Sequence, residues 1–351
     1  MTNIKLILVA GGKILEGGKQ AQYFVDIARW AYSFRKTTKL IEVFAPKNEI
    51  WISGIHMVLQ ELKKLKLVKD KFCNFTEELY DNAEDAQHKK TILECIKKAT
   101  AESLTIIILC NHGSKFGFSL PKPGNIISKE DLIKNNSGNP TLLIYDACGG
   151  NIFEDMPFNW TVITHPNATF SFIPEHSEIE TGIESIRIGG LLTMFFLSQI
   201  RNSFGNIISS INKMQKSLVN WEKYGTEEEE EKSDYVVYGS ELHPEFEYIF
   251  ENSKPIKLPF GILYAAFGNT IIQDRKKSLM ELKEKLMKWN VNVKYVKDLI
   301  PPRNFNEIEL ISIFDVVQKL KRWYDLPDYY LTQVALYIFL FHKEINELKP
   351  L

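Results

Sequence analysis

Short apolar runs and longer amphipathic stretches alternate along most of this chain. Uninterrupted apolar runs that are rich in β-branched residues are typical of buried parallel strands. Runs of this kind predict strands over residues 4–10, 39–44, 104–109, 141–145, 160–164 and 235–238.

Apolar residues at helical spacing predict helices between these strands. They are expected over residues 20–34, 55–67, 83–99, 128–133, 186–200 and 207–221. Ser128, with Asp131 three residues later, comes close to the capping-box pattern that opens a helix. Because strands and helices alternate, we expect an α/β fold with a mostly parallel sheet sandwiched by helices.

The pattern changes at about residue 274, from where helices are expected without strands. Leu279, Leu282 and Leu286 share one apolar stripe, and the pair Pro301-Pro302 interrupts the helical pattern. We therefore expect an α/β domain over residues 1–260 and a helical C-terminal domain over residues 274–351.

Composition narrows the classes of protein to which the chain can belong. It has 351 residues, of which 44% are hydrophobic and 25% charged, and its formal net charge is −1. These values describe a soluble globular protein without an overall field that would attract nucleic acid or an anionic membrane. Its four cysteines show no CxxC spacing, which favours a reducing compartment. With no recognisable signal peptide or membrane span, we expect a cytoplasmic location, and secretion by a non-classical route stays open.

Two of the predicted strands lead to residues that suit nucleophilic chemistry. The run at 104–109 is followed within three residues by His112, and the run at 141–145 by Cys148. In open α/β sheets ligands bind outside the carboxyl ends of the strands, so the two side chains would meet if the strands are neighbours. Taken singly, Cys148 is interpreted as an inert buried thiol and His112 as a loop histidine. Their joint occurrence at strand ends favours a thiolate and its proton-transfer partner.

Glycines follow both residues. Gly113 comes directly after His112, and Gly149 and Gly150 come directly after Cys148. A residue without a side chain lets the backbone approach a substrate closely. Backbone N–H groups at these positions would bind the oxyanion of a tetrahedral intermediate.

A buried strand ending in His-Gly, then one ending in Asp146-Ala147-Cys148-Gly149-Gly150, resembles the clan CD cysteine peptidases, which include caspases, metacaspases, gingipains and legumains. The flanking segments are most similar to legumains. The similar segments are residues 8–11, 30–32, 111–114, 152–157, 162–164 and 233–239. The resemblance covers about residues 4–240.

That resemblance implies a caspase-like fold and a cysteine endopeptidase that needs no cofactor or metal. Cys148 would be the nucleophile that forms an acyl-enzyme on a protein or peptide substrate, and His112 would be the general acid/base. The N–H groups of Gly113 and Cys148 would form the oxyanion hole. By its position, the helical C-terminal domain resembles the legumain pro-domain, which implies autoinhibition.

The resemblance is weaker in the substrate pocket. Legumains and caspases bind an Asn or Asp side chain at P1 with an Arg near the start of the first helix. Counting from Val9 gives Lys19 at that place, and counting back from Tyr32 gives Tyr23. Lys19 would bind such a side chain as a point charge, or it is a solvated loop lysine. The Asn that orients the His in legumains corresponds to about Lys13.

Two further residues match pocket positions. Ser171 corresponds to one of the legumain pocket serines, with an ordinary loop serine as the alternative. Asp146 would line the P1 pocket, or it caps the end of its strand. The P1 preference, Asn or Asp by the resemblance, stays open at this point.

Two other functions remain open for the same scaffold. One is a catalytically weak or inactive interaction module, since the Arg-like and Asn-like positions are substituted. The other is a transpeptidase or ligase, in which an amine takes the acyl group in place of water. Metal and nucleotide chemistry are not expected, because Cys110 and His112 lack a second ligand pair and residues 12–19 miss the spacing of a phosphate loop.

Overall fold

The structure is a computed structural model of the chain. It describes residues 4–11, 22–38, 40–46, 79, 83–122, 124–167, 171–172, 189–222, 234–256 and 322. The chain divides into two compact units, residues 1–211 with 233–256 and residues 212–232 with 257–351. The predicted helix at 55–67 lies outside the described residues, as does the predicted helical domain at 274–351 apart from Arg322.

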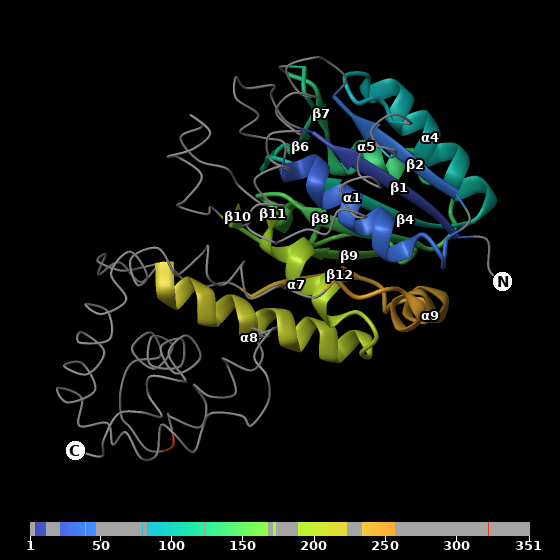
Figure 1. The fold of residues 1–351 in the computed structure, drawn as a ribbon. Coiled ribbons are helices and arrows are strands. Elements are labelled where there is room, and N and C mark those ends of the chain that lie inside the picture. The colour runs from blue at the N-terminus through green and yellow to red at the C-terminus, as the bar shows by residue number, and fades with distance from the viewer. Residues whose placement is uncertain are drawn as a thin grey trace, which may run out of the picture. The chain divides into compact units, whose positions relative to one another are not determined.

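The long apolar runs form the centre of a seven-stranded sheet with the order β12-β9-β8-β4-β1-β2-β3 (Figure 1). Its strands are β1 (Ile4–Ala10), β2 (Leu40–Ala45), β3 (Glu84–Asp85), β4 (Leu104–Cys110), β8 (Thr141–Asp146), β9 (Trp160–Thr164) and β12 (Val236–Gly239). Every pair is parallel except β12 with β9. The predicted mostly parallel sheet is therefore confirmed.

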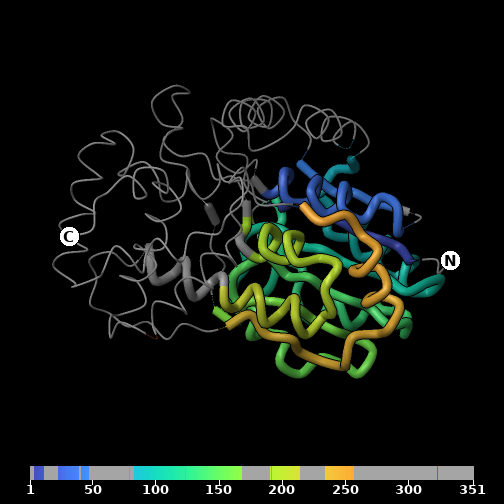
Figure 2. The backbone as a smooth tube through the Cα atoms, turned by 60° about the horizontal axis from the view of Figure 1, so that its bottom comes forward, coloured from blue at the N-terminus to red at the C-terminus, as the bar shows by residue number. Residues whose placement is uncertain are grey.

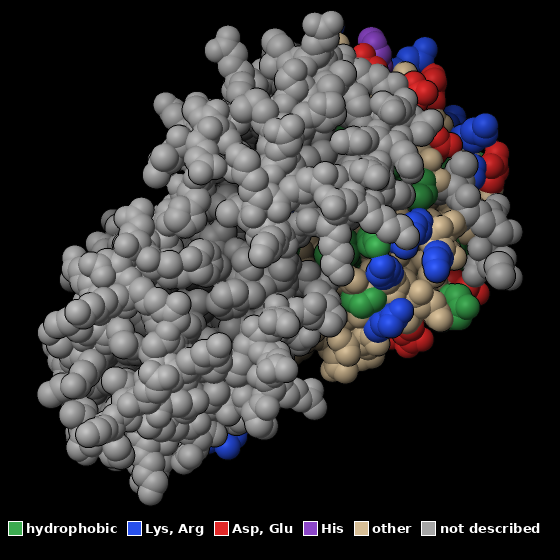
Figure 3. All heavy atoms as spheres, viewed as in Figure 1, with side chains coloured by type: hydrophobic (Ala, Val, Ile, Leu, Met, Phe, Trp, Pro, Cys, Tyr) green, Lys and Arg blue, Asp and Glu red, His purple; other side chains and the backbone are tan. Residues whose placement is uncertain are grey.

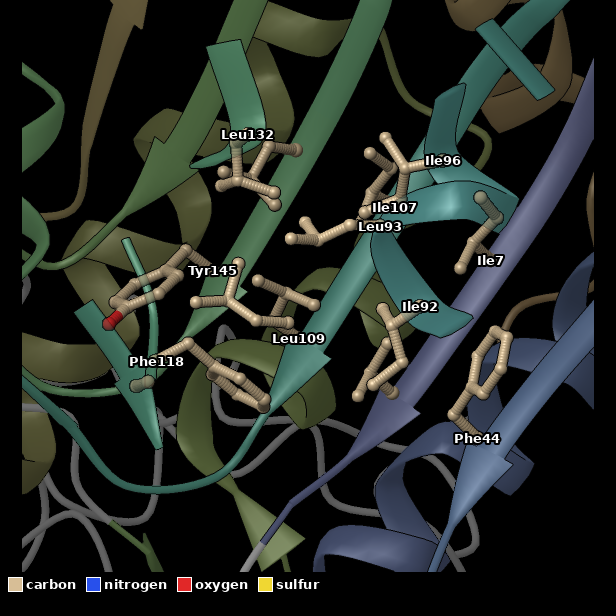
Figure 4. Close-up of a cluster of buried hydrophobic side chains, with 14 of the residues drawn as sticks. Ile7, Phe44, Ile92, Leu93, Ile96, Ile107, Leu109, Phe118, Leu132 and Tyr145 are labelled. Atoms are coloured by element: carbon tan, nitrogen blue, oxygen red, sulfur yellow. The ribbon is translucent and has the colours of Figure 1, made fainter. Parts of the chain in front are cut away.

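Helices cover both faces of this sheet. On one face, α4 (Lys89–Glu102) and α5 (Lys129–Lys134) pack against alternate residues of the strands, and Figure 4 shows Ile96 of α4 and Leu132 of α5 in one cluster with Ile107 of β4. The intervening strand residues are also buried, so they face the opposite layer. That layer contains α1 (Gln22–Phe34) and α7 (Leu191–Gln199).

Aromatic side chains join the helices of the second layer. The Trp30 ring of α1 lies 5.3 Å from that of Phe196 in α7, and Phe196 lies 5.1 Å from Phe250 of α9 (Pro244–Asn252). The backbone N–H of Lys254 donates to the carbonyl of Ser33 (3.1 Å), so the segment after α9 runs beside α1, as Figure 2 shows. The helix α8 (Phe204–Glu222) precedes β12 in the chain.

Two predicted helices begin later than expected, in each case because a short strand precedes them. α4 starts at Lys89, since Glu84–Asp85 pairs with β2 and the Ala86 N–H donates to the carbonyl of Ala45 (3.2 Å). α7 starts at Leu191, since β11 (Gly189–Gly190) pairs antiparallel with β10 (Ser171–Phe172).

Other short elements were not predicted at all. A three-stranded sheet follows β4 directly, and a 3-10 helix follows Cys148. These elements are β5 (Gly113–Ser114), β6 (Gly117–Ser119), β7 (Ile126–Ile127) and η2 (Gly150–Phe153). Strands of two or three residues are too short to carry a hydrophobic period, so the sequence pattern does not reveal them.

The exterior of the described part is of mixed charge. On the face shown in Figure 3, basic and acidic side chains lie side by side over the described residues, in keeping with the formal net charge of −1. In the part of the chain that the structure describes, no helix combines the length and the apolar character needed to cross a bilayer.

The predicted start of α5 is confirmed in atomic detail. The hydroxyl of Ser128 accepts a hydrogen bond from the Asp131 N–H (3.2 Å), and the Asp131 carboxylate accepts one from the Ser128 N–H (2.8 Å). This capping box satisfies two donors that a helix start would otherwise leave unpaired.

We expect Ser128→Ala to lower the free energy of unfolding by about 1 kcal/mol, because it removes the acceptor for the Asp131 N–H. Urea unfolding followed by circular dichroism would measure the change. Ser209→Ala, at an exposed position of α8, is the matched control and should change stability by less than about 0.5 kcal/mol. Equal effects of the two substitutions would contradict the capping role.

Candidate active site

The register between β4 and β8 brings the two predicted strand-end motifs to one place. The strands are parallel neighbours, and Cys110 pairs with Asp146. The Asn111 N–H still donates to the carbonyl of Asp146 (3.3 Å), so the pairing continues one step past the strand ends. His112 and Cys148 therefore follow the same edge of the sheet, each two residues beyond a paired position. The condition on which the predicted dyad depended is met.

The loops that carry the two residues touch through their backbones. A Cβ added to Gly113 would overlap both the carbonyl oxygen of Cys148 and the hydroxyl of Tyr145. A Cβ added to Gly149 would lie 2.7 Å from the carbonyl carbon of Ser114, and Gly149 has a φ of 80°. Both positions therefore need glycine, one for space and the other for space and backbone conformation. The glycines allow the His112 loop and the Cys148 loop to lie directly against each other.

The cysteines differ in their environments. Cys148 is partly exposed and Cys95 is half-buried, whereas Cys110 is buried. Burial raises the pKa of the Cys95 thiol to about 11 and that of Cys110 well above the ordinary value. Those two side chains are thus neutral thiols at physiological pH, and their surroundings suit structural cysteines.

His112 is exposed and contacts a residue of the first helix. The phenol oxygen of Tyr23 lies 3.4 Å from Nε2 of His112, and the two rings meet edge to face at 73°. Tyr23 is one of the two residues that counting placed at the Arg-like position. The sequence offered no sign that it would touch the histidine.

Backbone donors near Cys148 are partly occupied. The N–H groups of Gly149, Gly150 and Asn151 donate to the carbonyls of the loop after β9, at 2.7, 3.2 and 3.0 Å. The accepting residues are Asn167, His165 and Pro166. The Gly149 and Gly150 donors, which the sequence suggested for an oxyanion, are therefore committed to structure.

The Gly113 N–H, unlike the N–H groups of residues 149–151, is directed by its place in a β-ladder. The Ser119 N–H donates to the carbonyl of His112 (3.0 Å), which makes residues 112 and 119 a hydrogen-bonded pair of the β5–β6 ladder. The next pair, Gly113 with Phe118, is then the non-hydrogen-bonded type, because the two types alternate along antiparallel strands. The Gly113 N–H consequently points away from β6.

Asp146 is 4% exposed and serves as a partner for the start of α7. Its carboxylate accepts from the Thr193 N–H (3.1 Å) and from the Thr193 hydroxyl (2.6 Å). Burial raises the pKa of Asp146 to about 6, although the hydrogen bonds from Thr193 oppose that effect. These contacts give Asp146 a structural role at the start of α7, and its part in substrate binding stays a prediction.

A second carboxylate, which sequence reasoning missed, lies close by in the interior. Asp26 pairs with Arg29 at 3.0 Å and accepts from the Gly190 N–H (2.7 Å). Burial raises its pKa to about 8, and Arg29 opposes the rise while Asp146 adds to it. The signal was present in the sequence: two opposite charges three residues apart in a helix that is otherwise largely apolar.

The remaining predicted pocket residues divide between described and undescribed parts. Lys19 and Lys13 lie outside the described residues. Ser171 pairs with Gly190, whose backbone lies against the Asp146 carboxylate. The backbone of Ser171 thus belongs to the same neighbourhood as Asp146. Among the described residues there is no group of His, Cys, Asp or Glu side chains that could hold a metal ion.

Models of known protein families do not match this chain, and no significant match is found among curated proteins.

We expect Gly113→Ala to destabilise the protein by about 1–3 kcal/mol, because the new methyl group would overlap the Cys148 carbonyl and the Tyr145 hydroxyl. Chemical denaturation would measure the loss. The matched control is Gly205→Ala in α8, where an added Cβ meets nothing within 4 Å, and stability should be unchanged or higher. If Gly113→Ala were as stable as the control, the two loops would not be in contact.

The raised pKa of Asp146 predicts a pH dependence of stability. The folded protein keeps the proton of this carboxyl up to about pH 6, whereas an unfolded chain releases it near 3.9. Between these values the folded state binds more protons, so this group makes stability fall as pH rises, by at most about 1.4 kcal/mol per pH unit.

We expect Asp146→Asn to remove this contribution, which is measured by urea unfolding across that pH range. The control is Asp155→Asn, at an exposed aspartate, which should keep the pH dependence of the wild type. Parallel pH profiles of wild type and Asp146→Asn would show that the carboxyl titrates normally.

Proposed function

We propose that this chain is a cysteine endopeptidase of the caspase-like type, with Cys148 as nucleophile and His112 as general acid/base. The observation that carries the proposal is the direct backbone contact between the His112 loop and the Cys148 loop at the paired ends of β4 and β8. A mostly parallel sheet covered by helices on both faces is also the architecture that the resemblance to clan CD peptidases implies.

In the proposed reaction, the Cys148 thiolate attacks the carbonyl carbon of a peptide bond and forms a C–S bond. The carbon–nitrogen bond then breaks, and protonated His112 gives its proton to the leaving amine. Water attacks the resulting thioester while His112 accepts a proton from it, and the C–S bond breaks to release the acid and the thiolate. Each group returns to its starting state.

The negative charge on the carbonyl oxygen needs donors in the tetrahedral intermediate. The Gly113 N–H supports this role, because it points away from β6 and belongs to the loop that contacts Cys148. The N–H groups of residues 149–151 are bound to the loop after β9, so we assign the oxyanion to Gly113 and Cys148.

For the substrate, we propose only its class, a protein or peptide. Asn or Asp at P1 follows from the resemblance, which relies on a cation at the Arg-like position. Tyr23, which contacts His112, is one of the two candidates for that position and has no charge to offer an acidic side chain. Lys19 is the other. The autoinhibitory role of residues 274–351 likewise stays a proposal.

Covalent labelling tests the nucleophile. We expect a peptide with an electrophilic acyloxymethyl ketone to modify wild-type protein at Cys148, and Cys148→Ala to abolish both labelling and peptide cleavage. Cys95→Ala is the matched control, and it should retain both, because Cys95 is a half-buried thiol whose pKa is raised. Peptide mass spectrometry locates the label.

The outcomes separate the proposed function from its rivals. Cleavage that survives Cys148→Ala would refute the proposal. Absence of both labelling and cleavage in wild-type protein across a P1-scanning library would favour an interaction module. Products joined to an added amine, identified by their mass, would favour a transpeptidase or ligase.

A further inference from the structure

The contact between Tyr23 and His112 is the feature that the proposed reaction leaves unexplained. We propose that Tyr23 is a positioning residue, whose phenol oxygen accepts a hydrogen bond from Nε2–H of His112 and so assigns Nδ1 to the proton exchange. The inference rests on the proposed function for its catalytic meaning, while the hydrogen bond itself can be tested without any activity.

The geometry supports a defined contact between the two side chains. The phenol oxygen of Tyr23 lies 3.4 Å from Nε2, within hydrogen-bond range, and the ring centroids are 5.6 Å apart. The edge-to-face angle of 73° is a favourable arrangement for two aromatic rings. Polar and ring contacts together limit the rotation of the imidazole about its side-chain bonds.

Tyr23 is well suited to fix a mobile neighbour. It is only 7% exposed and lies in the first turn of α1, next to the fully buried Phe24 and Val25. His112, in contrast, is exposed and lies in the short connection between β4 and β5. A side chain on a packed helix provides a fixed point, whereas a loop side chain relies on its partners for orientation.

The direction of the hydrogen bond decides which nitrogen is used for chemistry. A phenol can donate or accept, and a neutral imidazole carries its proton on one nitrogen only. The proposed reaction cycles His112 between its neutral and protonated forms. With Nε2–H donating to Tyr23, the contact persists in both forms, and the proton is gained and lost at Nδ1.

Substitution of the hydroxyl alone tests this arrangement. In protein with ¹⁵N-labelled histidine, assigned by loss of the signal in His112→Gln, we expect neutral His112 to be the Nε2–H tautomer. We expect Tyr23→Phe to lower the pKa of His112, because the protonated ring loses an acceptor. Tyr248→Phe removes a hydroxyl from an exposed tyrosine of α9 and should leave the titration unchanged.

Two further measurements test how loss of the Tyr23 hydroxyl affects the reaction. In Tyr23→Phe we expect kcat for peptide cleavage to fall about five- to tenfold with little change in KM, as loss of one hydrogen bond of about 1 kcal/mol would give. The pH profile for alkylation of Cys148 by iodoacetamide should move to the same extent as the His112 titration. If Tyr23→Phe folds poorly, Tyr23→Met serves in its place, because it also fills the space without a hydroxyl. It should show the same fall in kcat and the same shift of the alkylation profile.

An Nδ1–H tautomer in the wild type would overturn the proposal, because Tyr23 would then be the donor. An unchanged His112 titration in folded Tyr23→Phe would overturn it as well. If the tautomer and titration are as expected but wild-type protein cleaves no peptide, the proposed function fails while the placement of His112 by Tyr23 stands.

Discussion

The pairing of β4 with β8 is the constraint on which the candidate site depends. Cys110 lies opposite Asp146, and every strand residue from Thr105 to Cys110 has a partner in that ladder. A slip by one residue would exchange the two faces of a strand that is buried on both sides. It would also move the His112 loop past the Cys148 loop and remove the fit of Gly113 against the Cys148 carbonyl. The apolar cores on both faces therefore determine which loops meet at the strand ends.

The turn after Cys148 is held from two directions. On one side, Gly149 lies against the backbone of Ser114, and on the other its N–H binds the carbonyl of Asn167 (2.7 Å). Gly150 is equally confined, since an added Cβ would overlap the Thr164 side chain and the His165 carbonyl. A turn confined in this way has its backbone conformation set by the fold itself, before any ligand arrives.

Sequence patterns predicted the sheet better than they predicted the surroundings of the site. The strands β1, β4, β8 and β9 are continuous apolar runs, and their parallel pairing follows from the alternation with helices. The prediction that the His112 loop and the Cys148 loop lie at the same edge of the sheet followed from the same logic. The two-residue strands β5, β10 and β11 carry no period of their own and form only because longer elements bring them together.

Sequence patterns could not predict contacts between residues that lie far apart in the chain. Thr193 binds Asp146 across 47 positions, and Tyr23 approaches His112 across 89. Neither contact leaves a pattern in the local sequence, because both form only when the tertiary structure brings distant segments together.

The interior at the end of β8 contains two carboxyls and one guanidinium, those of Asp26, Asp146 and Arg29. Asp26 and Asp146 interact electrostatically with each other, and Arg29 pairs with Asp26 at 3.0 Å. Burial raises the pKa of Asp26 to about 8 and that of Asp146 to about 6, so both carboxyls hold a proton to a higher pH than exposed carboxyls do. The cluster therefore ties α1 and the start of α7 to the end of β8, and each buried carboxyl has donors that offset the cost of its burial.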